Sequence, residues 1–347
     1  MRYLHLNPLK KFLFLTGLIV FGINLSFTAL VKFFPKFIIL PENAMWNYVN
    51  NVISNTTMDN DPHTLILGNS NLQAAIDPSQ LDNAVILSTP AASFFDIYHL
   101  LNKYLQNRLP PKIIISHFQP KPIISKTFWE MFIRFSELTF KEYSEIYENF
   151  KKYDTFPQGP TNKIAFFLEI YSFRLKLITK NIHIFQENLF SQDNYNAYKR
   201  MYEDVKKGRG FLTLYKDRVL FPKRLFETIH SIAPATKVKF YDHTFQEIQK
   251  VYVEKIINLT NKYNIKLVFL NLPYSPDYFS KNELELLSQK ISQLHSDICK
   301  LPNLTCLLKN EIDLPKKLFF DFSHLLPEGA RKFTNYTKKR LRVLKLM

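Results

Sequence analysis

The sequence predicts an α/β fold, a three-layer sandwich around a central parallel sheet, and three observations support this. Short apolar runs recur at Thr64–Leu67, Ala84–Leu87, Lys112–Ser116 and Lys266–Asn271. Continuous apolar runs of this kind are typical of strands that are covered on both faces, as in parallel sheets. Segments with helical periodicity lie between the runs. A serine follows the first run directly, at the strand end where open α/β sheets bind ligands.

The N-terminal segment is predicted to be a transmembrane helix. Residues Phe12–Val31 carry no charge, and a span of about 20 residues crosses a hydrocarbon core of about 30 Å. No small-x-small cleavage site is evident, although a cleaved signal peptide and a buried soluble helix are the alternatives. The basic residues before the span favour a cytoplasmic N-terminus and an extracytoplasmic body. Residues 1–31 are therefore expected to be a cytoplasmic tail and single-pass anchor.

The remaining chain is expected to contain a stalk at 32–61 and one α/β domain at 62–347. The stalk includes a short helix around Ala44–Ile53. In the domain, the pattern predicts a fifth strand at Thr305–Leu308 and helices at Phe94–Leu105, Phe245–Tyr263, Glu283–Ile298 and Pro327–Leu344. The aromatic, basic segment 121–235 breaks the alternation, so we interpret it as a helical insertion. It is either a lid or partner-docking surface, or a helical layer that only packs on the sheet.

Composition excludes several classes of function. The formal net charge is +16, which fits either a polyanionic partner or a solvated, lysine-rich surface. No nucleic-acid-binding motif accompanies the charge, so no nucleic-acid partner is expected. The sequence contains no GxGxxG, GxxxxGK[ST], CxxC or HExxH motif, and no metal site is predicted. Cys299 and Cys306 are either joined in a disulfide or present as buried thiols.

Three residues form a candidate catalytic set. Ser70 follows the first strand, while Asp321 and His324 lie in the loop before the last helix. A serine hydroxyl is a weak nucleophile until a base removes its proton, and that base needs a third group to orient it. Each residue alone also has an ordinary explanation, because serine caps helices and aspartate forms turns. The parallel sheet is what would bring the two loops to one edge.

These motifs resemble the SGNH (GDSL-like) hydrolase superfamily. The matching stretches are Gly68-Asn69-Ser70 and Asp321–Ala330, and the resemblance covers about 62–120 and 240–345. It implies a flavodoxin-like sheet, Ser70 as nucleophile, His324 as base and Asp321 as the residue that orients the base. With an N-terminal anchor, the chain is similar to extracytoplasmic proteins of polysaccharide O-acetylation and teichoic acid D-alanylation. Those proteins work beside a multi-spanning membrane acyltransferase.

The residues that would stabilise an oxyanion depart from the family pattern. The resemblance implies three donors: the N–H of the nucleophile, a glycine after strand two and an asparagine after strand three. Ala91 and Ala92 stand in place of the glycine, and Ser116-His117-Phe118-Gln119 contains no asparagine. The candidate donors are therefore Ala92, Asn69, Asn71, His117 and Gln119.

The expected function is transfer of an acyl group, with acetyl favoured, or ester hydrolysis on a cell-surface glycan through an acyl-Ser70 intermediate. The body would lie outside a bacterial inner or plasma membrane. The partners expected are the membrane, the glycan and a multi-spanning membrane acyltransferase, and the chemistry needs no cofactor. The alternatives are a plain esterase or lipase, and a catalytically inactive scaffold that binds a glycan or an acyltransferase.

Overall fold

A computed structural model gives the arrangement of most of the chain. It describes residues 7–33, 43–54, 61–89, 92–117, 138–156, 162–167, 192–213, 247–275, 304–307 and 314–347, with scattered residues between 280 and 312. The strands are β1 (Thr64–Gly68), β2 (Ala84–Ser88), β3 (Ile113–His117), β4 (Lys266–Leu270) and β5 (Leu304–Leu307). The α-helices are α1 (Pro8–Phe33), α2 (Asn43–Ser54), α3 (Ser70–Ala75), α4 (Phe94–Asn107), α6 (Phe140–Tyr153), α8 (Gln192–Lys207), α10 (Glu247–Lys262) and α12 (Pro327–Val343). Two short 3-10 helices, η2 (Pro78–Gln80) and η4 (Lys316–Leu318), complete the set.

The strands form one parallel sheet in the order β2-β1-β3-β4-β5. The chain passes from β1 outward to β2 and then returns to β3 on the other side of β1. The neighbouring strands β1 and β3 therefore mark the point where the direction of winding reverses, and doubly wound sheets bind ligands at the carboxyl ends of such strands. The α/β class and the parallel sheet agree with the prediction, and the strand bounds agree to within one or two residues.

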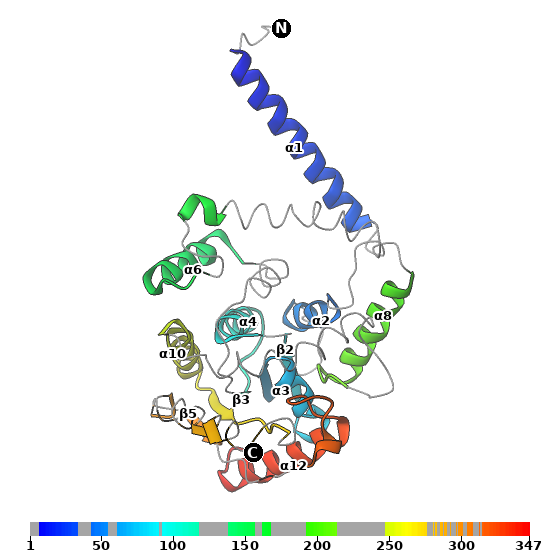
Figure 1. The fold of residues 1–347 in the computed structure, drawn as a ribbon, viewed down its shortest axis with the longest axis vertical. Coiled ribbons are helices and arrows are strands. Elements are labelled where there is room, and N and C mark those ends of the chain that lie inside the picture. Colours follow the sequence, from blue (N-terminus) through cyan, green and yellow to red (C-terminus); the bar gives the residue numbers. More distant parts are fainter. Residues whose placement is uncertain are drawn as a thin grey trace.

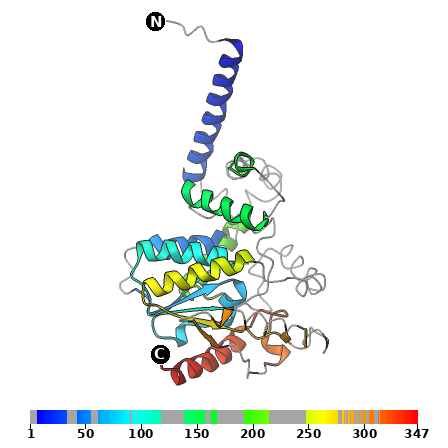
Figure 2. The ribbon, with the colours of Figure 1, turned by 90° about the vertical axis from the view of Figure 1, so that its left-hand side faces the viewer.

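Alternate strand residues face two separate cores, which makes a three-layer structure. Leu65, Val85, Ile114 and Leu267 lie in the core covered by α2, α4 and α10. Ile66, Ile86, Ile115 and Val268 face the core covered by α3 and α12. Figures 1 and 2 show these helix groups on opposite faces of the sheet. Burial on both faces explains why consecutive positions within β1, β2, β3 and β4 are apolar.

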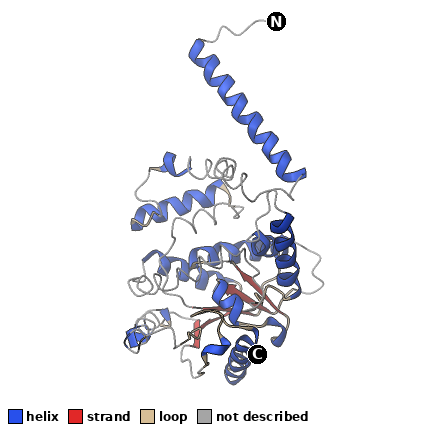
Figure 3. Ribbon diagram, turned by 45° about the vertical axis from the view of Figure 1, so that its right-hand side comes forward, coloured by secondary structure: helices blue, strands red, loops and turns tan. Residues whose placement is uncertain are grey.

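The predicted transmembrane helix requires correction. Residues Pro8–Phe33 do form a helix, α1, which extends away from the sheet (Figures 1 and 3). Within the described part of the chain, however, no helix combines the length and apolar character that a membrane span requires. Lys10 and Lys11 lie in the first turn of α1, and the polar residues Thr16 and Ser26 lie further along it. The transmembrane part of the predicted fold class is therefore wrong.

The described helices of the 121–235 segment pack on the body of the molecule. On one side, α8 lies along α2, where Asn47 and Asn51 donate hydrogen bonds to the hydroxyls of Tyr198 and Tyr202. On the other side, α6 lies against α10, where the Tyr252 hydroxyl accepts a hydrogen bond from Asn149 at 3.3 Å. These contacts are those of a helical layer. Most of the remaining positions between 121 and 235, and many of those in the predicted helix Glu283–Ile298, lie outside the described residues.

The turn after α8 covers the outer edge of the sheet at β2. The carbonyl of Arg209 accepts a hydrogen bond from the Ile86 N–H at 2.9 Å. Gly210 has a φ of +92°, and a Cβ at this position would lie 2.3 Å from the Ile86 carbonyl oxygen. Only glycine fits here, because both the backbone conformation and the close approach exclude a side chain. The turn thereby satisfies an N–H that an edge strand would otherwise expose.

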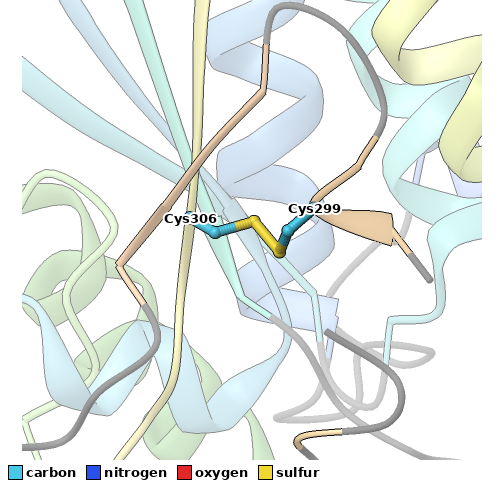
Figure 4. The surroundings of a disulfide bond; sticks show 2 residues. All are labelled: Cys299 and Cys306. Carbon is cyan, nitrogen blue, oxygen red and sulfur yellow. A yellow bond between two sulfur atoms is a disulfide. The ribbon is translucent and has the colours of Figure 1, made fainter. Parts of the chain in front are cut away.

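Cys299 and Cys306 form a disulfide, which selects between the two states left open by the sequence. Their Cα atoms are 6.0 Å apart. The bond ties β5 to the residues that precede it in the chain (Figure 4). Strand β5 is the outermost strand on its side of the sheet and is only partly buried. The disulfide therefore restrains an edge strand that pairs with β4 on one side.

His99 provides a test of the core beneath α4. It packs against the rings of Phe95, Tyr98 and Tyr252. Burial, aided by the charge of Lys255, lowers the pKa of His99 from 6.5 to about 3. In the unfolded chain His99 therefore becomes protonated below about pH 6.5, whereas in the folded protein it becomes protonated only near pH 3. This difference removes stability as the pH falls through that window.

We predict that His99→Gln weakens the loss of stability on acidification. The wild type should lose about 1 kcal/mol more than the variant for each pH unit below 6, because glutamine does not titrate. Urea unfolding between pH 7 and pH 4.5 measures this difference. Asp96, whose pKa burial raises to about 6, acts in the opposite direction and remains in both proteins. Parallel stability curves would contradict the prediction.

Candidate active site

Ser70 is delivered by a short turn from β1 into α3. β1 ends at Gly68, Asn69 caps the helix, and Ser70 is the first helical residue. The Asn69 side chain accepts a hydrogen bond from the Asn71 N–H at 2.9 Å, which is the usual function of an N-cap. Ser70 itself is half-buried while its neighbours are buried. The turn thus holds one hydroxyl at the carboxyl end of the sheet.

Gly68 leaves room at this turn for the side chains of His117 and Leu72. A Cβ at position 68 would lie 2.6 Å from Nδ1 of His117 and 2.7 Å from a methyl carbon of Leu72. His117 is the last residue of β3 and is almost fully buried, with 2 % exposure. Its imidazole therefore packs directly on the backbone two residues before Ser70. The glycine is required for its lack of a side chain rather than for an unusual φ.

The residues Asp321 and His324 lie in a hairpin between η4 and α12. The hairpin is closed by a bridge between Phe319 and Leu325 and by a hydrogen bond from the Phe320 N–H to the His324 carbonyl at 2.8 Å. A further bond runs from the Ser275 N–H, in the loop after β4, to the Phe322 carbonyl at 3.0 Å. These bonds fix the hairpin against the carboxyl edge of the sheet.

The two oxygens of Asp321 have different partners. One oxygen, Oδ1, accepts hydrogen bonds from the N–H groups of Ser323 and His324, both at 2.8 Å. The other, Oδ2, lies 2.8 Å from Nδ1 of His324. The first oxygen shapes the turn and the second orients the imidazole. A carboxylate whose oxygens both have partners holds the ring without adding a free acceptor to the site.

The imidazole of His324 links the hairpin to the nucleophile turn. Its Nε2 lies 3.0 Å from Oγ of Ser70, although the two residues are 254 positions apart in sequence. The structure thus brings Ser70, His324 and Asp321 together in one hydrogen-bonded chain. The side chain of His324 is 20 % exposed, so solvent or a substrate reaches the base, while that of Asp321 is 9 % exposed. The catalytic role of the three residues remains a prediction.

Asp321 is held in its ionised form. Burial raises the pKa of this carboxyl, but it is outweighed by the charge of His324 and the hydrogen bonds from His324 and Ser323. Together these lower the pKa to about 2. Asp321 therefore stays negative at any ordinary pH and favours a proton on the facing nitrogen, Nδ1 of His324. That leaves Nε2 as the nitrogen that accepts a proton from Ser70.

The predicted oxyanion donors differ in whether their N–H groups are already hydrogen-bonded. The Ala92 N–H donates to the Thr89 carbonyl at 3.2 Å, so it is committed to a turn. The Asn71 N–H is committed to the cap formed by the Asn69 side chain. The N–H of Ser70 has no acceptor among the described residues, as expected in the first turn of a helix. His117 lies beneath the turn against Gly68, and Gln119 lies outside the described residues.

Sequence reasoning missed Gln73, which fastens the nucleophile helix to the turn after α8. Gln73 is 1 % exposed. Its side-chain amide donates to the Gly210 carbonyl at 2.8 Å, and its own carbonyl accepts from the Leu212 N–H at 3.2 Å. The only sequence signal was a glutamine within a short apolar helix. Nothing in the sequence pointed to its partner 137 positions away.

Two further features bear on the site. In the parts of the chain that the structure describes, no group of three or more His, Cys, Asp or Glu residues could hold a metal ion. A cavity of about 520 Å³ lies between η2 and the end of α8 and includes Asp77, Asp204, Lys207 and Arg209 in its wall. None of the three linked residues lines this cavity, so it is separate from the candidate active site.

Comparisons with known proteins leave the function open. The sequence matches no protein-family model and no curated protein. Among solved structures it is similar to a protein of Streptococcus pneumonia that is provisionally described as a platelet activating factor. The sequence identity is 10 %, the match covers 93 % of this chain and 99 % of the other, and the TM-score is 0.39.

We predict that Gly68→Ala destabilises the fold while Gly22→Ala does not. The new methyl group at position 68 would have to displace the His117 ring, and overpacking of this kind costs about 1–3 kcal/mol. A Cβ at Gly22, in α1, meets nothing within 4 Å. Thermal unfolding of the full chain measures both effects. An unchanged Tm for Gly68→Ala would show that the turn tolerates a side chain.

Proposed function

We propose that this protein transfers or hydrolyses ester-linked acyl groups through an acyl-Ser70 intermediate. The observation that carries the proposal is the chain of contacts from Asp321 to His324 at 2.8 Å and from His324 to Ser70 at 3.0 Å. This arrangement supplies a nucleophile, a base within hydrogen-bonding reach and a group that orients the base. Nucleophile and base also meet at a partly exposed position, where a substrate can reach them.

The first half of the proposed reaction acylates Ser70. Nε2 of His324 takes the hydroxyl proton as Oγ attacks the carbonyl carbon of the ester. The resulting oxyanion is stabilised by the N–H of Ser70. Nε2 then returns the proton to the departing alcohol oxygen as the ester C–O bond breaks, leaving an acyl-Ser70 ester. Asp321 remains ionised throughout and stabilises the imidazolium that forms.

The second half releases the acyl group. A hydroxyl of an acceptor, or a water molecule, gives its proton to Nε2 of His324 and attacks the acyl carbon. The proton then returns to Oγ of Ser70 as the acyl–oxygen bond breaks, which regenerates the enzyme. An acceptor hydroxyl gives acyl transfer, and water gives hydrolysis. The acyl group we favour is acetyl and the acceptor is a cell-surface glycan.

We place this chemistry outside the cytoplasm. The disulfide between Cys299 and Cys306 supports this placement, because disulfides persist in oxidising compartments and are rare in the cytosol. An acyl donor outside the cytoplasm must be supplied across or within the membrane. A multi-spanning membrane acyltransferase is therefore the partner we propose as the source of the acyl group.

A scaffold that binds its partner without catalysis is the alternative function. It is favoured by the N–H groups of Ala92 and Asn71, which are bonded elsewhere, whereas the N–H of Ser70 has no acceptor among the described residues. Loss of one oxyanion donor typically slows acyl transfer by 10²–10³-fold. Serine reactivity separates the two functions, because a scaffold needs no activated hydroxyl.

We predict that a fluorophosphonate labels the full-length protein once, on Ser70. Intact-mass analysis should show a single adduct that is absent from Ser70→Ala and His324→Ala. Asp321→Asn should keep the fold, because an amide oxygen can still accept the N–H bonds of the turn. Its labelling rate should nevertheless fall by about 10²–10⁴-fold, since the imidazole loses its orienting charge.

Ser275→Ala is the matched control for this experiment. Its hydroxyl is buried in the neighbouring loop after β4 and has no hydrogen-bond partner among the described residues. The variant should label at the rate of the wild type. A folded wild type that forms no adduct, or an adduct that persists in Ser70→Ala, would overturn the proposed enzyme and favour the scaffold.

A further inference from the structure

The C-terminal part of the chain concentrates positive charge. Residues 316–347 contain nine Lys and Arg residues and only two acidic residues, Asp321 and Glu328. Asp321 is buried against His324. Glu328 is paired with Lys332 at 3.0 Å, one turn along the same helix. The charge that this segment exposes is therefore strongly positive in balance.

The charges gather along one face of α12. The buried face of this helix carries Ala330, Phe333, Thr334, Thr337 and Leu341. The exposed basic residues lie at positions Arg331, Lys332, Lys339 and Arg342. At 100° per residue, these four positions share the face opposite the core. A helix of 17 residues is about 25 Å long at 1.5 Å per residue, so the face is an extended cationic track.

This track begins beside the candidate active site. The Leu326 N–H, just before α12, donates to the Leu318 carbonyl of η4 at 2.8 Å. A Cβ on Gly329 would lie 2.6 Å from that same carbonyl oxygen, so α12 and η4 are in close contact. Lys316 and Lys317 are exposed on η4. Basic residues therefore lie on both elements that flank the hairpin carrying Asp321 and His324, namely η4 before it and α12 after it.

We propose that this surface binds an acidic polysaccharide and leads it to Ser70. The surface, here named the α12 basic face, consists of Lys316, Lys317, Arg331, Lys332, Lys339 and Arg342. A linear polymer bearing carboxylate or phosphate groups would lie along α12 with one end at the hairpin. The delivery of its hydroxyls to the site rests on the proposed function, whereas the binding itself does not.

The chemistry of the face favours an acidic polysaccharide over a nucleic acid or a lipid surface. Single-stranded nucleic acids are held by exposed aromatic rings, but the one aromatic residue of α12 outside its buried face, Tyr336, is half-buried and stacked on Phe333. Helices that bind membranes insert an apolar face, whereas the apolar face of α12 is in the core. A polysaccharide needs only charge and also supplies the hydroxyls that an acyl acceptor requires.

The test compares two triple variants of the full chain. Arg331→Gln/Lys339→Gln/Arg342→Gln removes three charges from the α12 basic face. Lys112→Gln/Lys151→Gln/Lys266→Gln removes three exposed charges elsewhere, two of them at the amino ends of β3 and β4. The probe is fluorescein-labelled polygalacturonate, with neutral dextran of equal length as the control polymer. Fluorescence anisotropy gives Kd across a series of salt concentrations.

The α12 variant should bind polygalacturonate about 10-fold or more weakly than the wild type. The slope of log Kd against log salt concentration should fall by about two to three, because fewer counterions are released on binding. The other triple variant should stay within about 2-fold. Neutral dextran should not bind. Equal losses in both variants would overturn the proposal in favour of net charge alone. Tighter binding to an oligonucleotide, or to vesicles rich in phosphatidylglycerol, would overturn it in favour of those partners.

Fluorophosphonate labelling separates this inference from the proposed function. The α12 variant should label on Ser70 at the wild-type rate, because none of its three residues contacts the hydrogen-bonded chain. Suppose that the wild type forms no fluorophosphonate adduct, but its binding of polygalacturonate is lost in the α12 variant. This result would uphold the α12 basic face as a docking surface and overturn the delivery of the polymer to Ser70. A fluorophosphonate adduct on Ser70, without binding of polygalacturonate that depends on the α12 basic face, would overturn the docking surface and leave the proposed serine chemistry intact.

Discussion

Asp321 divides its carboxylate between two tasks, and the geometry of the candidate site depends on that division. One oxygen accepts the N–H groups that close the turn, and the other holds Nδ1 of His324. The orientation of the base is therefore set by the same bonds that set the backbone of the hairpin. Because the pKa of Asp321 is about 2, neither set of bonds is lost by protonation at ordinary pH. The contact between His324 and Ser70 follows from this arrangement.

The rest of the fold serves to bring that hairpin to the end of β1. Parallel strands place all their carboxyl ends at one edge, and the reversal between β1 and β3 opens that edge to loops. Gly68 leaves room for the His117 ring beneath the turn to Ser70, and the loop after β4 holds the hairpin through the bond from the Ser275 N–H to the Phe322 carbonyl. On the far side, Gln73 ties α3 to the turn at Gly210. The nucleophile helix is thus held at two places, by His324 at Ser70 and by the turn beside the edge strand β2 at Gln73.

Local patterns predicted the elements well and their interactions less well. The runs around Ile66, Ile86 and Ile115 indicated buried strands because consecutive positions were apolar, and both faces proved to be covered. The N-terminal helix was predicted as well, but its assignment as a membrane span is wrong. Donor availability could not be predicted, because the N–H of Ala92 is committed by a turn bond that depends on the path of the folded chain.

The sequence by itself determined the α/β class, the two short motifs and the residue types that carry the candidate chemistry. These depend on periodicity and on neighbours within a few positions, such as the turn formed by Asp321 with Ser323 and His324. The tertiary structure decided which residues meet: Ser70 with His324, Gln73 with Gly210, and Gly68 with His117. Contacts between residues 49 or more positions apart depend on strand order and on how closely the backbones approach, and one chain's local pattern specifies neither.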